Sequence, residues 1–317
     1  MNLFSQSVIS SLDSRKRAVS RSLETLCTLP SISGLFKRFR SWAIVGGAVR
    51  DLLLVRDIHH SHFMFDFPDV DIAVDKAIPK GYFDKLLGDV HVATNSFGGI
   101  KLRSPNLGVI DIWAWESRSG FESTLLKERL PYVDFGMNSV AFVWPQREIL
   151  IHERWITDVK ALVVEKLDTP KVQFLIVRGC ALAAKLEKIA KRKIPLGPRV
   201  SEDFRDIIDR DDAEWHSSIR YLKSKVVSGR WDSYAAVYFA KVATKLRPHC
   251  ANRLAQEGLI AACRSASSRV LVSKILAEAA TSDSSGFRPL REEWQQLLSA
   301  PTSELPHDSE SNVGLML

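Results

Sequence analysis

Residues 43–54 read AIVGGAVRDLLL, a short β-branched run followed by two glycines and the beginning of an apolar helical pattern. This order predicts a strand, a tight turn and a helix. Gly46 and Gly47 carry no Cβ, so the turn can adopt positive φ and bring backbone N–H groups close to a phosphate. The N-terminus of the following helix adds a favourable dipole, with Arg50 one turn in as a counter-charge. The structural alternative is an ordinary strand-to-helix turn in which Arg50 pairs with a carboxylate.

A second stretch, DVDIAV at Asp69–Val74, supplies two acids to one strand. Residues two apart on a strand point to the same face, so Asp69 and Asp71 are expected side by side, where a divalent cation would offset their repulsion. A third acid, Asp111, lies in another apolar strand pattern, where an unpaired charge is costly. Three convergent acids suit metal-dependent nucleotidyl transfer, so we expect Mg²⁺ or Mn²⁺ as the cofactor and a nucleoside triphosphate as substrate. The alternative is that Asp69 and Asp71 end a strand and pair with Arg or Lys.

The two halves of the chain carry different hydrophobic patterns. Between residues 42 and 152, short β-branched runs are separated by Gly, Pro and Asn turns. Helical patterns interrupt these runs at 48–55, 80–87 and 121–130. After about residue 166, apolar positions recur every three or four residues, with a Pro-containing break at 194–198. The predicted fold class is therefore α+β, with a sheet-bearing first half and an all-helical second half.

These patterns divide the chain into four expected regions. They are an N-terminal helix at 1–30, a head domain at 31–165, a helical neck and body at 166–300, and a disordered tail at 301–317. The tail is rich in Pro, Ser, Glu and Asp and has little to bury.

The composition excludes several classes of protein. The chain has 317 residues, 45% of them hydrophobic, and a net charge of +7, with ordinary Gly and Pro contents. These values exclude collagen-like, disordered and disulfide-scaffold proteins. Its 4 cysteines form no CxxC pair, and no apolar run is long enough for a membrane span. We therefore expect a cytoplasmic protein without a membrane partner.

The Ser- and Arg-rich beginning of the chain has two interpretations. It is similar to a transit peptide, but Asp13 and Glu24 interrupt the basic pattern. The apolar residues Val19, Leu23 and Leu26 favour an ordinary amphipathic helix instead.

Taken in order, the motifs resemble those of class II CCA-adding enzymes and bacterial poly(A) polymerases, a branch of the DNA polymerase β superfamily. The matching segments are 46–54 with 69–71, 97–101 with 109–112, 134–141 (DFGMNSVA), 158–160 (DVK) and 178–186. Two departures stand out. Tyr132 and Val133 occupy positions that are usually basic in the family, and residues 171–175 lack the polar residues of its base-reading motif.

The resemblance implies a polymerase β-like nucleotidyltransferase head with a mixed sheet. It implies that Asp69 and Asp71 bind the catalytic cations, and that Asp111 completes the site and acts on the attacking hydroxyl. It further implies nucleotide-binding roles for five residues: Gly46, Gly47 and Arg50 at the triphosphate, and Asp134 and Asn138 bracing the nucleotide pocket or the strand beneath it.

A basic cluster follows in the helical half. Lys188, Lys191, Arg192 and Lys193 are candidate contacts for RNA phosphates, although a solvated helix face explains them equally well. The nearby aromatics Trp215, Tyr221 and Trp231 are expected in the core.

One further cluster has a metal-binding interpretation. His59, His60 and His62 lie close together, but without an anchoring Cys or carboxylate at zinc spacing they predict a solvated loop.

Three functions remain open from the sequence. The first is a metal-dependent nucleotidyltransferase that adds a nucleoside monophosphate to an RNA 3′ end, with tRNA as the expected acceptor. The second is a diverged toxin- or defence-type transferase that modifies tRNA or a protein side chain. The third is an inactive RNA-binding module that keeps the fold. The sequence does not specify an oligomeric state.

Overall fold

The computed structural model describes residues 3–28, 30–55, 69–79, 81–83, 91–94, 99–104, 108–115, 125–168, 174–210 and 213–282. The predicted tail at 301–317 and the loop that holds His59, His60 and His62 lie outside these residues.

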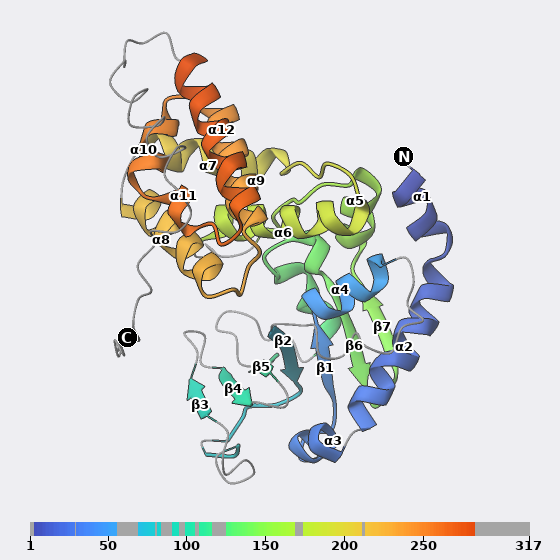
Figure 1. Ribbon diagram of the computed structural model, residues 1–317. Coiled ribbons are helices and arrows are strands. Elements are labelled where there is room, and N and C mark those ends of the chain that lie inside the picture. Colours follow the sequence, from blue (N-terminus) through green and yellow to red (C-terminus); the bar gives the residue numbers. More distant parts are fainter. Residues whose placement is uncertain are drawn as a thin grey trace.

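One mixed sheet forms the head (Figure 1). Its described strands are β1 (Trp42–Val45), β2 (Asp69–Val74), β3 (His91–Thr94), β4 (Ile100–Ser104), β5 (Gly108–Ala114), β6 (Val140–Trp144) and β7 (Glu148–Ile151). They lie in the order β3-β4-β5-β2-β1-β6-β7. β2 and β5 pair in parallel, and every other neighbouring pair is antiparallel. The sheet-bearing first half is therefore confirmed.

The interior strand β6, which lies between β1 and β7, is absent from the sequence prediction. Its residues Val140–Val143 are all buried, because both faces of this part of the sheet are covered. A strand buried on both faces is apolar without alternation, which removes the period of two that marks a half-buried strand.

The two faces of the sheet have different cores. Ile44, Ile72 and Ile112 belong to the large core, together with Val19 from α2 (Leu12–Thr28) and Leu53 from α4 (Gly47–Leu54). The opposite face carries a smaller cluster, which includes Val45, Ala73, Trp115, Leu126 and Leu130. Because side chains alternate along a strand, Asp71 and Asp111 belong to this second, less covered face.

Three helices begin the chain, and the second of them runs along the sheet while the first lies beside α5 (Figure 1). They are α1 (Leu3–Ser10), α2 and α3 (Pro30–Phe36). Val19, Leu23 and Cys27 of α2 are buried, which confirms an amphipathic helix. The single helix expected at 1–30 is interrupted at Ser11, and α3 begins at its predicted end.

After residue 166, the described chain forms helices joined by short connections, and no strand is present among these residues, as predicted. These helices are α6 (Leu175–Ala190), α7 (Pro198–Arg210), α8 (Ala213–Val227), α9 (Tyr234–Leu246), α10 (Cys250–Gln256), α11 (Leu259–Ala262) and α12 (Ala266–Ser282). The predicted break at 194–198 separates α6 from α7. Trp215 is fully buried, as expected, whereas Tyr221 and Trp231 are half-buried.

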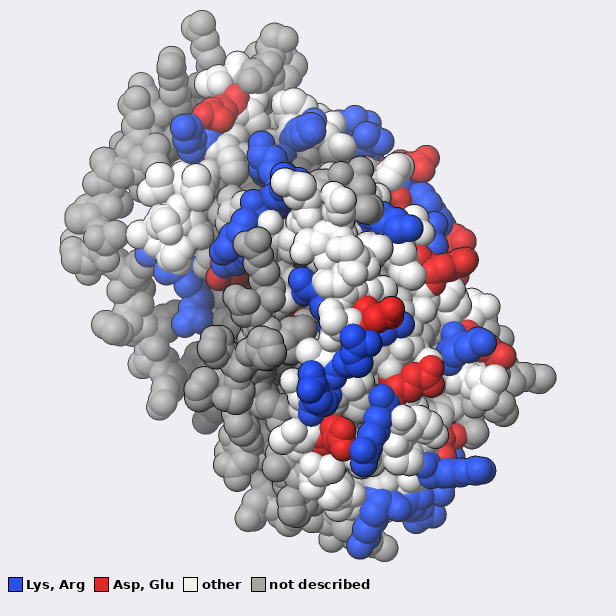
Figure 2. All heavy atoms as spheres, turned by 90° about the vertical axis from the view of Figure 1, so that its right-hand side faces the viewer, with Lys and Arg blue, Asp and Glu red and all other residues white. Residues whose placement is uncertain are grey.

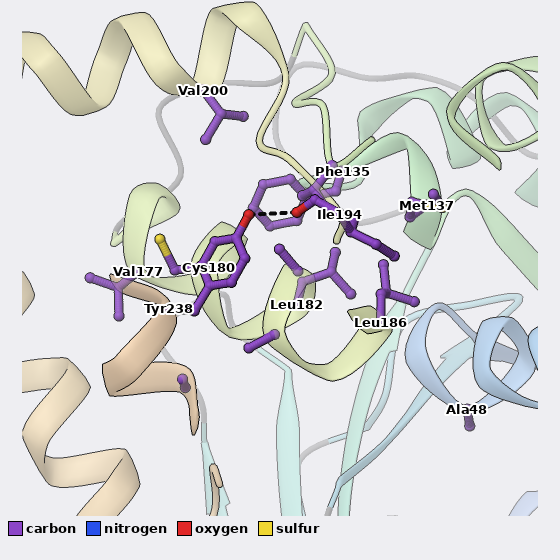
Figure 3. Packing of buried hydrophobic residues seen from close by; sticks show 14 of the residues in the cluster. Ala48, Phe135, Met137, Val177, Cys180, Leu182, Leu186, Ile194, Val200 and Tyr238 are labelled. Carbon is purple, nitrogen blue, oxygen red and sulfur yellow. Dashed lines mark hydrogen bonds between the residues drawn. The ribbon is translucent and has the colours of Figure 1, made fainter. Parts of the chain in front are cut away.

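The core is continuous from the head into the helical half. Phe135 and Met137 from the head lie in the same cluster as Leu186 of α6 and Tyr238 of α9 (Figure 3). The Tyr238 hydroxyl donates to the carbonyl oxygen of Ile194 at 2.5 Å. The four cysteines are buried and unpaired, consistent with the absence of a disulfide framework.

Two predicted helices are corrected. The α-helix expected at 121–130 is wrong over its described part, where the 3₁₀ turn Leu126–Glu128 is followed by another at Leu130–Tyr132. Pro131 lies in the second turn and lacks the N–H that a continuing α-helix needs. Of the helix expected at 80–87, the described residues 81–83 form a turn.

α5 (Glu153–Ala161) closes the head beside the 3₁₀ turn Gly136–Asn138. In the described part of the chain, no helix has the length and apolar character needed to cross a membrane.

Candidate active site

The Gly46–Gly47 turn has the predicted form of strand, turn and helix. Gly46 follows β1 with a φ of 66°, which strains residues that carry a Cβ. Its N–H donates to the carbonyl oxygen of Val140 on β6 at 2.9 Å, and α4 begins at Gly47. The turn therefore presents the N-terminus of α4 at the end of β1.

Two of the three predicted acids lie directly opposite each other. Asp71 on β2 and Asp111 on β5 are register partners in the parallel pair. On its other side, Asp71 is paired with Val45, the residue that precedes the glycine turn. Neighbouring strands lie about 4.8 Å apart, so the turn, Asp71 and Asp111 form one row across the sheet. Asp69 begins β2 opposite Val109, and its side chain is outside the described structure.

The row continues to Lys101, which the sequence patterns did not indicate as a charge partner. Lys101 on β4 is the register partner of Asp111, and its Nζ lies 2.8 Å from Asp111 Oδ2. The other carboxylate oxygen, Asp111 Oδ1, is buried and has no hydrogen-bond partner in the described structure. This pair could have been predicted only from the register between β4 and β5. Register depends on how two strands align, so the sequence of one strand does not specify it.

The described carboxylates fit a divalent cation. Among the described side chains, no group of three or more His, Cys, Asp or Glu is close enough to hold a metal ion, and the side chain of Asp69 is not among them. Asp71 is exposed, and Asp111 Oδ1 is a buried acceptor that requires a partner. Carboxylate oxygens are the ligands that Mg²⁺ and Mn²⁺ prefer, so both residues are suitable donors.

Arg50 lies in a buried network. Its side chain is 5% exposed, and its Nε donates to Asp51 Oδ1 at 2.7 Å. The guanidinium also donates to Asn138 Oδ1, and Asp51 forms an ion pair with Lys185 of α6. This arrangement corresponds to the structural alternative for Arg50, and its contact with a triphosphate stays a prediction.

Asp134 and Asn138 are brought together as expected, and Arg178 of α6 completes the group. Asn138 Nδ2 donates to Asp134 Oδ1 at 2.8 Å, and Arg178 Nε donates to Asp134 Oδ2 at 3.1 Å. Burial alone would raise the pKa of Asp134, but the charge of Arg178 and these hydrogen bonds hold it below its ordinary value. The pKa of Arg178 is raised, mainly by Asp134, with a smaller contribution from Asp71.

Arg178 enters the sequence interpretation only as the first residue of the matched segment 178–186, although it pairs with Asp134 and its charge also interacts with that of Asp71. The signal that could have identified it is a single cation inside the apolar run Leu175–Ala184. Such a residue needs a carboxylate partner when the helix is buried.

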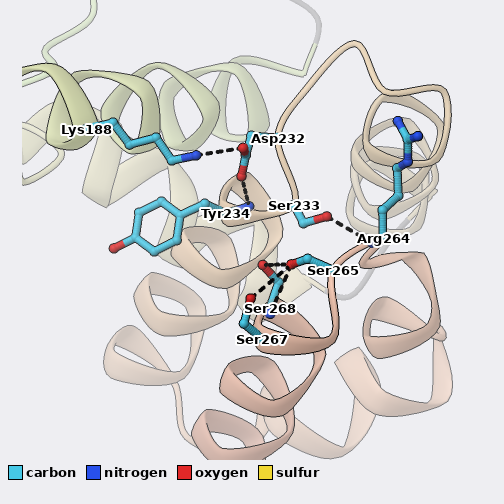
Figure 4. Close-up of polar contacts among 8 residues, drawn as sticks. All are labelled: Lys188, Asp232, Ser233, Tyr234, Arg264, Ser265, Ser267 and Ser268. Atoms are coloured by element: carbon cyan, nitrogen blue, oxygen red, sulfur yellow. Dashed lines mark hydrogen bonds and ion pairs between the residues drawn. The ribbon is translucent and has the colours of Figure 1, made fainter. Parts of the chain in front are cut away.

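The basic residues expected at RNA lie along and beyond the C-terminal part of α6. Lys188 Nζ lies 2.6 Å from Asp232 Oδ2 and 5.8 Å from the ring centroid of Tyr234 (Figure 4). Lys191, Arg192 and Lys193 follow at the end of the helix and are exposed. Their contact with RNA stays a prediction.

Comparisons with known proteins found similarity at the level of solved structures. No protein-family model and no curated protein matches the chain. A tRNA-processing enzyme with CTP is 21% identical, with a TM-score of 0.45, and the match covers 68% of this chain and 54% of that one. Another tRNA-processing enzyme complex is 17% identical, with a TM-score of 0.49 and coverages of 85% and 74%.

A third similar structure is the Thermotoga maritima CCA-adding enzyme complexed with tRNA. It is 19% identical, with a TM-score of 0.37, and the match covers 72% of this chain and 49% of that one. The chain thus spans about half the length of this enzyme and of the enzyme with CTP. The functional assignment consequently depends on the residues of the site.

Proposed function

We propose that the protein is a metal-dependent nucleotidyltransferase that moves a nucleoside monophosphate from a nucleoside triphosphate to an RNA 3′ end, with tRNA as the acceptor. The observation that carries the proposal is the row formed by the Gly46–Gly47 turn, Asp71 and Asp111. A phosphate-sized group beside the turn would also lie beside both carboxylates. Metal-dependent phosphoryl transfer needs this adjacency.

The acids and the turn have separate roles in this proposal. Asp69, Asp71 and Asp111 would hold the cation, which when bound lowers the pKa of the attacking hydroxyl and offsets the charge of the triphosphate. The first N–H groups of α4 would donate to phosphate oxygens. Asp111 Oδ1 would face the attacking hydroxyl, since Oδ2 is held by Lys101.

Asn138 would brace the nucleotide pocket. Its Oδ1 accepts from Arg50 and its Nδ2 donates to Asp134, so its amide orientation is fixed from both sides. Asp134 stays ionised because Arg178 lowers its pKa, and an ionised Asp134 keeps accepting from Asn138. This network supports a rigid wall for the pocket.

The test is incorporation of each α-labelled nucleoside triphosphate into total tRNA with magnesium. Asp71→Asn should lower incorporation by about a thousandfold, because the carboxylate supplies several kcal/mol of transition-state stabilisation through the cation. Asp75→Asn is the matched control, since Asp75 follows the same strand but lies outside the row and accepts from the N–H of Ser41. The control should retain transfer, and both variants should show the thermal unfolding midpoint of a folded protein.

The outcomes distinguish the three functions. Label on tRNA that is lost in Asp71→Asn supports the proposal. Label on protein would favour a transferase that modifies side chains. Magnesium-independent RNA binding with no incorporation of any nucleotide would identify an inactive RNA-binding module and contradict the proposal.

A further inference from the structure

Positive charge is concentrated near the beginning of the chain. Residues 12–40 hold seven Lys and Arg but only two Asp and Glu, a net charge of +5 out of +7 for all 317 residues. Fewer than a tenth of the residues thus carry most of the excess charge. Such asymmetry indicates an anionic partner when the charges share one surface.

The charges do share one surface, which is built from α2, the segment after α3 and the turn between β6 and β7. The Arg147 guanidinium, in that turn, lies 2.9 Å from Glu24 of α2, and Ser20 Oγ donates to the Arg147 carbonyl oxygen at 3.2 Å. Ser41 Oγ, beside Arg40, donates to the carbonyl oxygen of Trp144 at 3.1 Å. Figure 2 shows this side of the molecule, on which Lys and Arg side chains gather. We define the N-terminal basic face as Arg17, Arg21, Lys37, Arg38, Arg40 and Arg147, all of them exposed.

Several of these cations are available to a ligand, whereas their neighbour Arg15 is not. Arg15 donates to the carbonyl oxygens of Leu53 and Val55 and so terminates α4. In contrast, Arg17, Arg21, Lys37 and Arg40 have no ion pair with any described residue. If these cations had a structural role, they would be engaged by protein groups, as Arg15 is by carbonyl oxygens and Arg147 is by Glu24.

The face suits a polyanion in water better than a lipid bilayer. A helix that lies in a membrane interface exposes large apolar side chains next to its charges. In α2 the residues Val19, Leu23 and Cys27 are buried against the sheet. Among the described side chains of residues 3–40, Leu3 is the only exposed large apolar one. Phosphate groups on a nucleic acid backbone need only the cations.

The face also lies away from the acids. α2 packs on the sheet face that carries Ile72 and Ile112, whereas Asp71 and Asp111 belong to the opposite face. Its ligand is therefore not the reacting 3′ end.

We propose that the N-terminal basic face binds the phosphate backbone of the RNA at a distance from the reacting end, as a second, sequence-independent contact. The choice of RNA as the polyanion rests on the proposed function.

The test measures binding alone, by fluorescence anisotropy of labelled tRNA at several salt concentrations. The variant Arg17→Gln/Arg21→Gln/Lys37→Gln/Arg40→Gln should bind at least tenfold more weakly at low salt. Its plot of log K against log salt should be shallower by about 3, since each lost phosphate contact removes roughly 0.7 to 0.9 from the slope. Binding does not require transfer, so the result stands even where no nucleotide is incorporated.

The matched control removes the same charge elsewhere. Arg205→Gln/Lys241→Gln/Lys245→Gln/Lys274→Gln changes exposed residues of α7, α9 and α12 and should change the Kd less than threefold. Equal weakening in both variants would mean that net charge alone drives binding, and unchanged binding in the first would remove the face from the RNA contact. Loss of binding to phosphatidylserine vesicles, with tRNA binding intact, would assign the face to a membrane and overturn the proposal.

Discussion

Lys101 decides how much of Asp111 is available to a cation. Its ammonium group lies 2.8 Å from Asp111 Oδ2, so it occupies one of the two carboxylate oxygens and would repel a divalent ion bound nearby. We expect Lys101→Met to bind Mn²⁺ about tenfold more tightly, because a repulsion of about 1.4 kcal/mol is removed. Isothermal titration calorimetry of the protein without nucleotide measures this affinity directly.

A suitable control for this change is Lys76→Met. Lys76 is exposed just beyond β2 and forms no ion pair with a described residue, so its removal changes the net charge equally. Its Mn²⁺ affinity should stay close to that of the wild type. An affinity that is unchanged or weaker in Lys101→Met would show that the lysine does not compete with the cation.

At the scale of single elements, the buried Asp158 of α5 explains why a glycine occupies position 136. A Cβ at Gly136 would lie 2.2 Å from Asp158 Oδ2, so the 3₁₀ turn Gly136–Asn138 can approach α5 only with glycine there. Asp158 is 1% exposed, and burial raises its pKa to about 7, with Glu165 adding to the shift and Arg154 opposing it. Between about pH 4 and 7, the folded protein therefore holds a proton on Asp158 that the unfolded chain releases.

This proton makes stability depend on pH. Because the folded pKa of Asp158 is raised from 3.8 to about 7, the stabilising effect is complete below about pH 4 and is lost as the pH rises to 7. The free energy of unfolding of the wild type, relative to Asp158→Asn, should fall by about 1.4 kcal/mol for each pH unit between these limits. Urea titrations of both proteins at pH 5, 6, 7 and 8 measure the difference.

The same titrations include a variant of the same helix. Glu153→Gln alters an exposed carboxylate at the start of α5 and keeps Asp158, so it should keep the pH-dependent fall. A constant difference between the wild type and Asp158→Asn across this range would mean that Asp158 is ionised in the folded protein.

Some elements of the fold can be predicted from one sequence, and others cannot. β1, the turn at Gly46 and α4 follow from residues 43–54 because their signals are local: a β-branched run, two glycines and an apolar helical pattern. The pairing of Lys101 with Asp111 depends on strand register, and β6 is hidden because its residues are buried on both faces. Local patterns therefore predicted the strands that carry Asp71 and Asp111, and the turn. The ion-pair partners of the acids lie on other strands and helices, and only the structure identified them.

At the scale of the whole molecule, α6 connects the helical half to the head. Its Arg178 reaches Asp134, and its Lys185 reaches Asp51, which in turn binds Arg50. Figure 1 shows α6 between the sheet and the C-terminal helices. A shift of α6 would therefore disturb the residues that brace the proposed nucleotide pocket.

The strength of this connection can be measured with Arg178→Met. The side chain of Asp134 is 10% exposed and that of Arg178 is 40% exposed, so the pair lies between a surface ion pair and a buried one. We expect a loss of about 2 kcal/mol in the free energy of unfolding, because Asp134 would keep its charge without its main partner. Adding Asp134→Asn to Arg178→Met should restore part of the loss, since the uncompensated charge is then removed.

Lys188→Met breaks an exposed pair on the same helix and should lower the free energy of unfolding by less than about 1 kcal/mol. Equal losses for Arg178→Met and Lys188→Met, without recovery in the double variant, would show that Arg178 does not join the two halves through Asp134.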